Sequence, residues 1–271
     1  MTEISETSPL NAAIHALVRE VTERAILPHY QTLAADQITA KVADDVVTVA
    51  DNLAEDMLTE GLAKIMDLPV LGEEAAFADE RVLELAAGDC WIVDPLDGTR
   101  NFARGEPPFG ILLALSSGGE AQAGWIYDCL TGRLCVAERG KGALVNGEKI
   151  VARPTGEDRP VAAVSMVFVD PDKRAGLKAA LGDHYHQVDI PWCCAEQYPR
   201  LALGENDLAL FERTLPWDHA AAALWLNEAG GKAARPDGSP YRVDEWQRPG
   251  LIGAASPQLW DEMAERLSPL P

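Results

Sequence analysis

The sequence has 271 residues, of which 47% are hydrophobic, and it carries a formal net charge of −20 from 43 acidic and 23 basic side chains. This length and apolar content suffice for a large buried core, while the negative charge argues against nucleic acid and anionic membranes as partners. No stretch approaches the roughly 18 apolar residues that a membrane-spanning helix requires, and five cysteines without a CxxC pair are typical of a reduced protein. We therefore expect a soluble, cytoplasmic protein.

The N-terminal part is predicted to hold two helices separated by a strand. Ser8-Pro9 is a typical helix start, and apolar residues follow at helical spacing until Pro28. Residues 44–51 (DDVVTVAD) are rich in β-branched side chains and predict a strand that ends at Asp51, with a helix directly after it.

Two further short strands are predicted to end at acidic residues. Residues 66–77 contain a strand that leads into Gly72-Glu73-Glu74, and residues 90–94 (CWIVD) form a strand that ends at Asp94.

The next part of the chain is sheet-like, and a polar segment follows it. Residues 109–150 predict a series of strands, with a hairpin turn at Asn146-Gly147. Residues 152–160 are rich in turn formers and are the predicted boundary between two lobes. We expect an N-terminal α+β lobe over residues 1–155 that carries most metal ligands, and a C-terminal α/β lobe over residues 156–271.

The C-terminal lobe is predicted to begin with a buried strand at residues 161–169 and to contain an apolar helix over residues 217–231, ended by Gly230-Gly231. Because strands and helices alternate throughout, the fold class is α+β or α/β.

Five acidic residues share a type of position that points to a metal site. Asp51, Glu73, Asp94 and Asp97 lie at or just after the ends of predicted strands, and Asp218 lies in the first turn of a helix. If the strands are neighbours, these carboxylates converge and repel one another unless a cation is bound. An all-oxygen ligand set favours Mg²⁺ over Zn²⁺.

The residues after Asp97 are suited to binding an anion. Gly98 and Thr99 are predicted to open a short helix whose backbone N–H groups have no partner within the helix. Cations on one side and N–H donors on the other would form a receptor for a phosphate ester.

Each acidic residue also has a purely structural interpretation. Asp51 is a good helix N-cap, Asp218 would complement a helix dipole, and Glu73-Glu74 and the DPLDG segment at 94–98 would make solvated turns. A shared metal site explains all five positions together.

Four motifs in a fixed order resemble the inositol monophosphatase family of metal-dependent, lithium-sensitive sugar phosphatases. They span residues 45–231 and comprise DVVTVAD (45–51), GEE (72–74), DPLDGTRNF (94–102), and WDHAA (217–221) followed by EAGG (228–231). The resemblance implies an αβαβα layered sandwich, Mg²⁺-dependent hydrolysis of phosphomonoesters with two or three ions per site, and a homodimer.

The resemblance also implies a role for each matching residue. Glu73, Asp94, Asp97, Asp218 and the Leu96 carbonyl would bind metal. Asp51 and Thr99, together with Glu73, would act in catalysis by positioning the attacking water. The substrate would contact Asp97, Gly98, Thr99 and Asp218.

The chain departs from the inositol-specific members where they contact the substrate. The Gly-Ser/Thr-Ala-Ala stretch of those members is replaced by Trp192-Cys193-Cys194-Ala195-Glu196, which makes Cys194 a substrate contact. The polyol-binding glutamate is replaced by Phe211, with Glu212 one position along, and a phenyl ring accepts no hydrogen bond from a hydroxyl group.

The sequence therefore predicts a phosphatase that acts on a small phosphorylated polyol, sugar or related metabolite. Histidinol-phosphate, fructose-bisphosphate and nucleotide 3′-phosphatase activities are the alternatives within the family, and a non-enzymatic regulatory protein is the alternative of another class. A redox role for Cys193-Cys194 and a metal site at His184 and His186 have less support.

Overall fold

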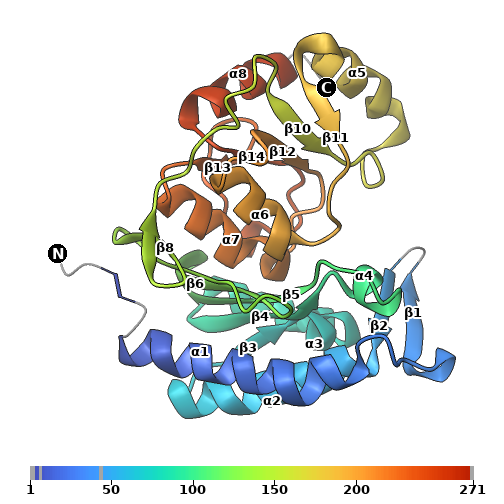
Figure 1. Cartoon of the computed structure of the whole chain (residues 1–271), viewed down its shortest axis with the longest axis vertical. Helices are drawn as coiled ribbons and strands as arrows, with labels where there is room; N and C mark the ends of the chain where they lie inside the picture. The colour runs from blue at the N-terminus through green and yellow to red at the C-terminus, as the bar shows by residue number, and fades with distance from the viewer. Residues whose placement is uncertain (1–3, 6–7, 43–44, 269–271) are drawn as a thin grey trace.

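The computed structural model describes residues 4–5, 8–42 and 45–268. Two β-sheets are stacked with helices between them and on both outer faces, in the order helix, sheet, helix, sheet, helix (Figure 1). This is the αβαβα layered sandwich that the resemblance implies, so the predicted fold class is confirmed.

The larger sheet has seven strands in the order β3-β4-β5-β6-β7-β8-β9. Only β3 and β4 are parallel, and the other neighbours pair antiparallel. The strands are β3 (Val70–Gly72), β4 (Cys90–Asp97), β5 (Gly110–Ser117), β6 (Glu120–Asp128), β7 (Leu134–Glu138), β8 (Gly142–Val145) and β9 (Glu148–Ile150).

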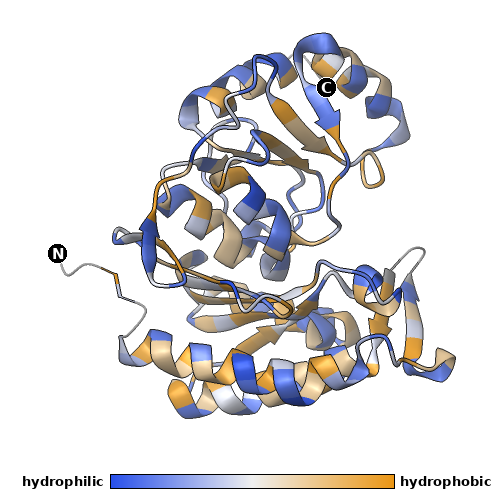
Figure 2. Ribbon diagram, in the orientation of Figure 1, coloured by the Kyte–Doolittle hydropathy of each residue, from blue (hydrophilic) through white to orange (hydrophobic). Residues whose placement is uncertain are grey.

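One face of this sheet is covered by the outer helices α1 (Pro9–Val21) and α2 (Val49–Ile65). Side chains alternate across the strand, so Trp91 and Val93 of β4 pack toward these helices while Cys90 and Ile92 pack toward the middle of the molecule. Figure 2 shows the matching pattern, with polar and apolar residues alternating along α1 and α2.

The middle layer consists of α6 (Cys194–Ala202) and α7 (Pro216–Glu228). Small residues let α7 lie close to the larger sheet, since a Cβ atom at Gly124 of β6 would lie 2.8 Å from the Cα of Ala221. This contact places the start of α7, and with it Asp218, over the end of β4 where Asp94 lies.

The smaller sheet has five strands in the order β11-β10-β12-β14-β13, and α5 (Pro171–Leu181) and α8 (Pro257–Leu267) cover its outer face. Its strands are β10 (Val161–Val164), β11 (His186–Val188), β12 (Leu208–Phe211), β13 (Lys232–Ala234) and β14 (Leu251–Ala254).

The remaining elements are short. A two-stranded hairpin pairs β1 (Ile38–Val42) with β2 (Asp45–Thr48), and α3 (Glu73–Ala78) and α4 (Thr99–Ala103) follow β3 and β4. A π-helix (Thr22–Ile26) continues α1, and 3₁₀ turns span Leu27–His29, Ala35–Gln37, Glu80–Ala87, Gly182–His184 and Val243–Glu245. Among the described residues, no helix combines the length and the apolar character that crossing a bilayer would require.

Most predicted elements are present, and two have the wrong limits. The helix at Ser8-Pro9, the Asn146-Gly147 hairpin and the helix that ends before Gly230 are confirmed. The strand predicted to end at Asp51 stops at Thr48, because the Thr48 side chain caps α2. The strand predicted over 161–169 stops at Val164.

Candidate active site

One pocket collects residues from the ends of several elements of both sheets. It is bordered by the C-terminal end of β4, the starts of α3, α4, α6 and α7, the end of β12 and the loops that precede α5 and α6. Every predicted site residue except Asp51 lines it, namely Glu73, Asp94, Leu96, Asp97, Gly98, Thr99, Cys194, Phe211, Glu212 and Asp218.

Three carboxylates in this pocket form a candidate cation site. Asp94, Asp97 and Asp218 each offer an oxygen atom, and these atoms lie within 4.8 Å of one another. Burial and the nearby charge of Glu73 raise the pKa of Asp94 well above its ordinary value. Carboxylates held together in this way are suited to a hard divalent cation, so the donor set fits a magnesium-type ion.

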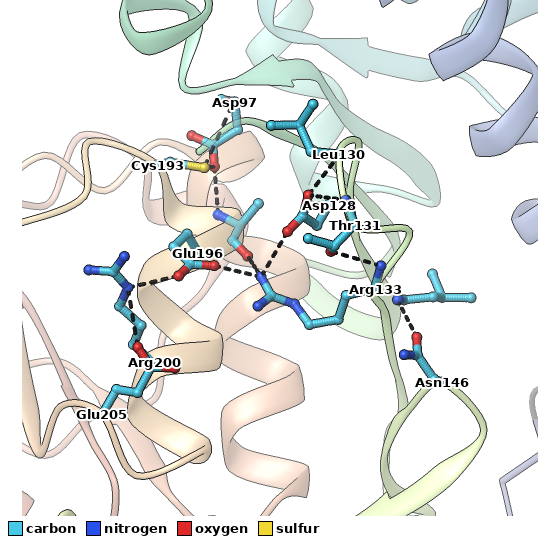
Figure 3. Close-up of polar contacts among 12 residues, drawn as sticks. Asp97, Asp128, Leu130, Thr131, Arg133, Asn146, Cys193, Glu196, Arg200 and Glu205 are labelled. Carbon is cyan, nitrogen blue, oxygen red and sulfur yellow. Dashed lines mark hydrogen bonds and ion pairs between the residues drawn. The ribbon is translucent and has the colours of Figure 1, made fainter. Parts of the chain in front are cut away.

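Asp97 also joins the two halves of the pocket, because its carboxylate caps helix α6. Asp97 Oδ2 accepts a hydrogen bond from Ala195 N at 2.5 Å and another from Cys193 Sγ at 3.1 Å (Figure 3). Burial raises the pKa of Asp97 to about 6, although these hydrogen bonds act in the opposite direction. The position of this carboxylate therefore depends on the position of α6.

An arginine from the turn after β6 holds the start of α6. Arg133 Nη2 donates to Ala195 O at 3.2 Å and to Glu196 Oε2 at 2.7 Å, while Arg200 Nε donates to the other oxygen of Glu196 at 2.8 Å. Figure 3 shows this network directly beside the contact between Asp97 and α6. The arginine thus supports a pocket carboxylate from outside the pocket.

Asp51 lies behind the pocket and is connected to it through Thr99. Its Oδ2 accepts hydrogen bonds from Thr48 N at 2.8 Å and from Thr48 Oγ1 at 2.6 Å, and its Oδ1 lies 2.9 Å from Thr99 Oγ1. The N-cap of α2 is Thr48, so the alternative that Asp51 is itself the N-cap is wrong. Burial raises the pKa of Asp51 to about 6.

Thr99 has more acceptors near its hydroxyl group than it can serve. Its Oγ1 lies 2.9 Å from Asp51 Oδ1 and 2.8 Å from Leu96 O, but a hydroxyl group has only one hydrogen. When ionised Asp51 accepts that hydrogen, the Leu96 carbonyl does not receive it.

Gly98 is required for the turn between β4 and α4. Its φ of 86° lies in the left-handed region, and a Cβ atom there would lie 2.7 Å from Pro108 O. Only glycine fits this position, which explains the glycine of the DPLDGT segment.

The sequence reasoning missed Lys41. Its Nζ lies 2.9 Å from Glu73 Oε1 and 2.6 Å from Glu74 Oε1, and the lysine side chain is only 3% exposed. Burial lowers the pKa of Lys41, but the two glutamates outweigh this effect and leave it above the ordinary value. Glu73 therefore lines the pocket while it is paired, together with Glu74, with the buried Lys41 ammonium group.

The structure also bears on the two interpretations with less support, a redox pair at Cys193-Cys194 and a metal site at His184 and His186. Cys193 and Cys194 are free thiols, so they form no disulfide, and Cys194 lines the pocket. His184 and His186 are exposed, and in the part of the chain that the structure describes the only candidate metal group is the three aspartates.

Comparisons with known proteins show which family and fold the chain resembles. The sequence profile of the inositol monophosphatase family matches residues 6–269. A histidinol-phosphatase of Chlorobaculum parvum is 34% identical over 72% of this chain and 74% of its own length. An inositol-1-monophosphatase of Caulobacter vibrioides is 32% identical over 85% of this chain and 90% of its own. The extragenic suppressor protein suhB of Bartonella henselae has a similar structure, with a TM-score of 0.80 and 25% identity over 96% of this chain and 98% of that one.

Proposed function

Since this chain belongs to the inositol monophosphatase family, we propose that it is a Mg²⁺-dependent phosphomonoesterase that acts on a small phosphorylated metabolite. The observation that carries this proposal is the group of three carboxylates within 4.8 Å, next to the hydrogen-bonded pair of Asp51 and Thr99. Related proteins named histidinol-phosphatase and inositol-1-monophosphatase support a phosphatase activity.

We assign the metal ligands to five residues. Asp94, Asp97 and Asp218 form the core of the site, and Glu73 and the Leu96 carbonyl complete it. Two or three Mg²⁺ ions in such a site would lower the pKa of a water molecule and neutralise charge on the phosphate. Lys41 contacts Glu73 through Oε1, so the lysine and the metal would share this carboxylate.

Asp51 and Thr99 are placed to handle the attacking water. Thr99 Oγ1 donates to the ionised Asp51 carboxylate and keeps its own lone pairs for a hydrogen of the water molecule. Asp51 then accepts a proton through this contact, and its pKa of about 6 keeps it ionised, and so able to accept one, at neutral pH. Glu73, whose charge acts on Asp51, is the third residue that we assign to catalysis.

The phosphate and the leaving alcohol are assigned to the remaining lining residues. The backbone N–H groups of Gly98 and Thr99 belong to the turn that Gly98 makes possible, and we assign the phosphate oxygens to them. Cys194, Phe211 and Glu212 border the region of the leaving alcohol, together with Asp97 and Asp218.

The experiment that tests this function is phosphate release from a panel of phosphomonoesters, measured with Mg²⁺ and with a chelator. The panel includes inositol 1-phosphate, histidinol phosphate, fructose 1,6-bisphosphate and a nucleoside 3′-phosphate, which covers the alternatives within the family. We expect turnover that disappears with the chelator. If folded protein releases no phosphate from any of these, the activity is refuted and the regulatory alternative gains support.

We also propose that the protein is cytoplasmic and forms a homodimer. Sedimentation of the purified protein tests the homodimer.

A further inference from the structure

We infer that the leaving alcohol of the substrate carries an apolar group, aromatic or aliphatic, that lies against Phe211 and extends into a second pocket. This inference rests on the proposed phosphatase function and narrows its substrate class. It is carried by the shape and chemistry of the wall that faces the leaving alcohol.

The pocket is lined by two chemically different parts of the chain. Residues 73–100 supply carboxylates and the Gly98-Thr99 turn, whereas, apart from Leu96, the apolar lining residues come from positions 168–211. These apolar residues are Phe168, Ile190, Pro191, Trp192, Leu210 and Phe211. Residues 165–219 also supply the polar lining residues Ser165, Gln197, Glu212, Arg213, Asp218 and His219. At the polyol-binding position itself, however, stands Phe211, and a phenyl ring gives a hydroxyl group no replacement for the water partners that it loses.

Trp192 is held in this wall at a conformational cost. Its φ is 56°, in the left-handed region that a bulky side chain rarely adopts. The preceding carbonyl, Pro191 O, accepts a hydrogen bond from Asn101 Nδ2 at 2.9 Å, and the Arg100 guanidinium lies 4.5 Å from the indole ring. Such backbone strain collects at functional sites, where the surrounding structure enforces it.

Phe211 is held in place by two neighbouring rings, those of Tyr198 and His219. The Tyr198 ring stacks on it at 5.2 Å with an angle of 5°, and the His219 ring meets it edge to face at 4.8 Å. Both nitrogens of His219 have partners, since Nδ1 lies 2.9 Å from the Tyr198 hydroxyl and Nε2 lies 3.1 Å from Arg213 O. Both hydrogen-bonding positions of the imidazole are therefore used in keeping Phe211 and Tyr198 in place.

Glu212 does not take the place of the missing polyol-binding glutamate, because its side chain follows a different direction from that of Phe211. In β12, Ala209 and Phe211 pack with the core of the middle helices, while Leu208 and Leu210 pack with the core under α5 and α8. By this alternation Glu212 follows the direction of Leu210. The pairing continues past the strand end, because Gly250 N donates to Glu212 O at 3.0 Å.

A second pocket adjoins the first at Phe211. The two share Ser165, Leu210, Phe211 and Glu212. The second pocket is otherwise mostly apolar, and its further apolar lining consists of Val169, Leu177, Pro236, Leu251, Ile252 and Leu267. An apolar group that passes Phe211 thus meets more apolar surface, and each buried methylene is worth roughly a fourfold gain in binding.

The test is the specificity constant kcat/KM of the wild-type protein with Mg²⁺ for esters of alcohols of similar acidity. Ethyl, butyl, hexyl and 2-phenylethyl phosphate are compared with glycerol 2-phosphate and inositol 1-phosphate. We expect kcat/KM to rise at least tenfold from ethyl to hexyl phosphate, and 2-phenylethyl phosphate to exceed both polyol esters.

The variant Phe211→Glu restores a carboxylate on the wall and should shift preference toward the polyol esters, while the matched control Phe211→Leu should keep the apolar preference. The wild-type series decides the inference even if Phe211→Glu fails to fold. If the protein hydrolyses these esters with no dependence on chain length, or prefers the polyol esters, the apolar subsite is refuted and the phosphatase function stands. If none of the esters, nor the wider panel, is hydrolysed, the phosphatase function itself fails.

Discussion

At the scale of single residues, the pocket acids oppose the stability of the protein when no cation is bound. Asp94 is buried beside Asp97 and Asp218, and both burial and its charged neighbours disfavour its ionised form. Neutralising this one side chain removes repulsion and also removes a central ligand.

We therefore predict that Asp94→Asn abolishes phosphate release, weakens Mg²⁺ binding and raises the melting temperature of the metal-free protein by a few degrees. Activity assays, Mg²⁺ titration and thermal unfolding without metal check the three parts. Lys232→Gln, which removes an exposed ion pair with Asp261, is the control and should leave activity unchanged. An active Asp94→Asn variant would contradict the metal assignment.

The sequence could predict most of the site at this scale, because several acids stand at the ends of apolar strands and the GT turn follows one of them. Asp94, Asp97 and Asp218 converge as expected. Lys41 could not be predicted in the same way. It reaches Glu73 only because the β1–β2 hairpin folds back over α3, and nothing in the local sequence indicates that long-range contact.

At the scale of elements, the site depends on how α6 is docked. The Asp97 carboxylate is oriented by a hydrogen bond from Ala195 N in the first turn of this helix. Arg133, in the β6–β7 connection, donates a hydrogen bond to Ala195 O in the same turn. The docking of α6 thus controls the position of a pocket carboxylate.

We predict that Arg133→Met lowers stability by about 1–3 kcal/mol, because Ala195 O and Glu196 lose a buried charged donor. It should also raise the Mg²⁺ concentration needed for half-maximal activity several-fold. The matched control is Arg200→Met, which removes the other partner of Glu196 without touching Ala195. Equal Mg²⁺ requirements in the two variants would show that Arg133 has no positioning role.

The two element limits that the sequence got wrong have different physical causes. At 45–51, the hydroxyl group of Thr48 caps α2 and ends a run of β-branched residues that would otherwise favour a longer strand. At 161–169, the strand ends at Val164 and the chain turns toward the pocket, leaving Phe168 45% exposed. The first limit is set by a local capping interaction and the second by the point where the chain turns toward the pocket, and both override the β-propensity of the residues.

At the scale of the whole molecule, the buried acids link stability to pH and to Mg²⁺. Burial raises the pKa of Asp51 and Asp97 from the ordinary 3.8 to about 6. Between these values the folded, metal-free protein binds protons that the unfolded chain has lost. Its free energy of unfolding therefore falls as the pH rises through this window, by up to about 1.4 kcal/mol per pH unit and group.

We predict that Mg²⁺ raises the melting temperature strongly above pH 6, where these carboxylates are ionised, and progressively less as the pH falls toward 4. The measurement is the difference between thermal unfolding with Mg²⁺ and with a chelator across this range. Taking the difference removes the contribution of His219, whose pKa burial lowers to about 3 and which acts equally with and without metal. A Mg²⁺ effect that is constant from pH 4 to 8 would contradict the prediction.

The described chain passes from the seven-stranded sheet to the five-stranded sheet only once, over residues 151–160, between β9 and β10. A protease cut in this connection would leave two pieces, one with Asp94 and Asp97 and the other with Asp218. Neither piece alone holds all the metal ligands that we assign, so a bound divalent ion would link the two pieces. Reconstitution of the enzyme from separately expressed pieces should then require the cation as well as the apolar middle layer.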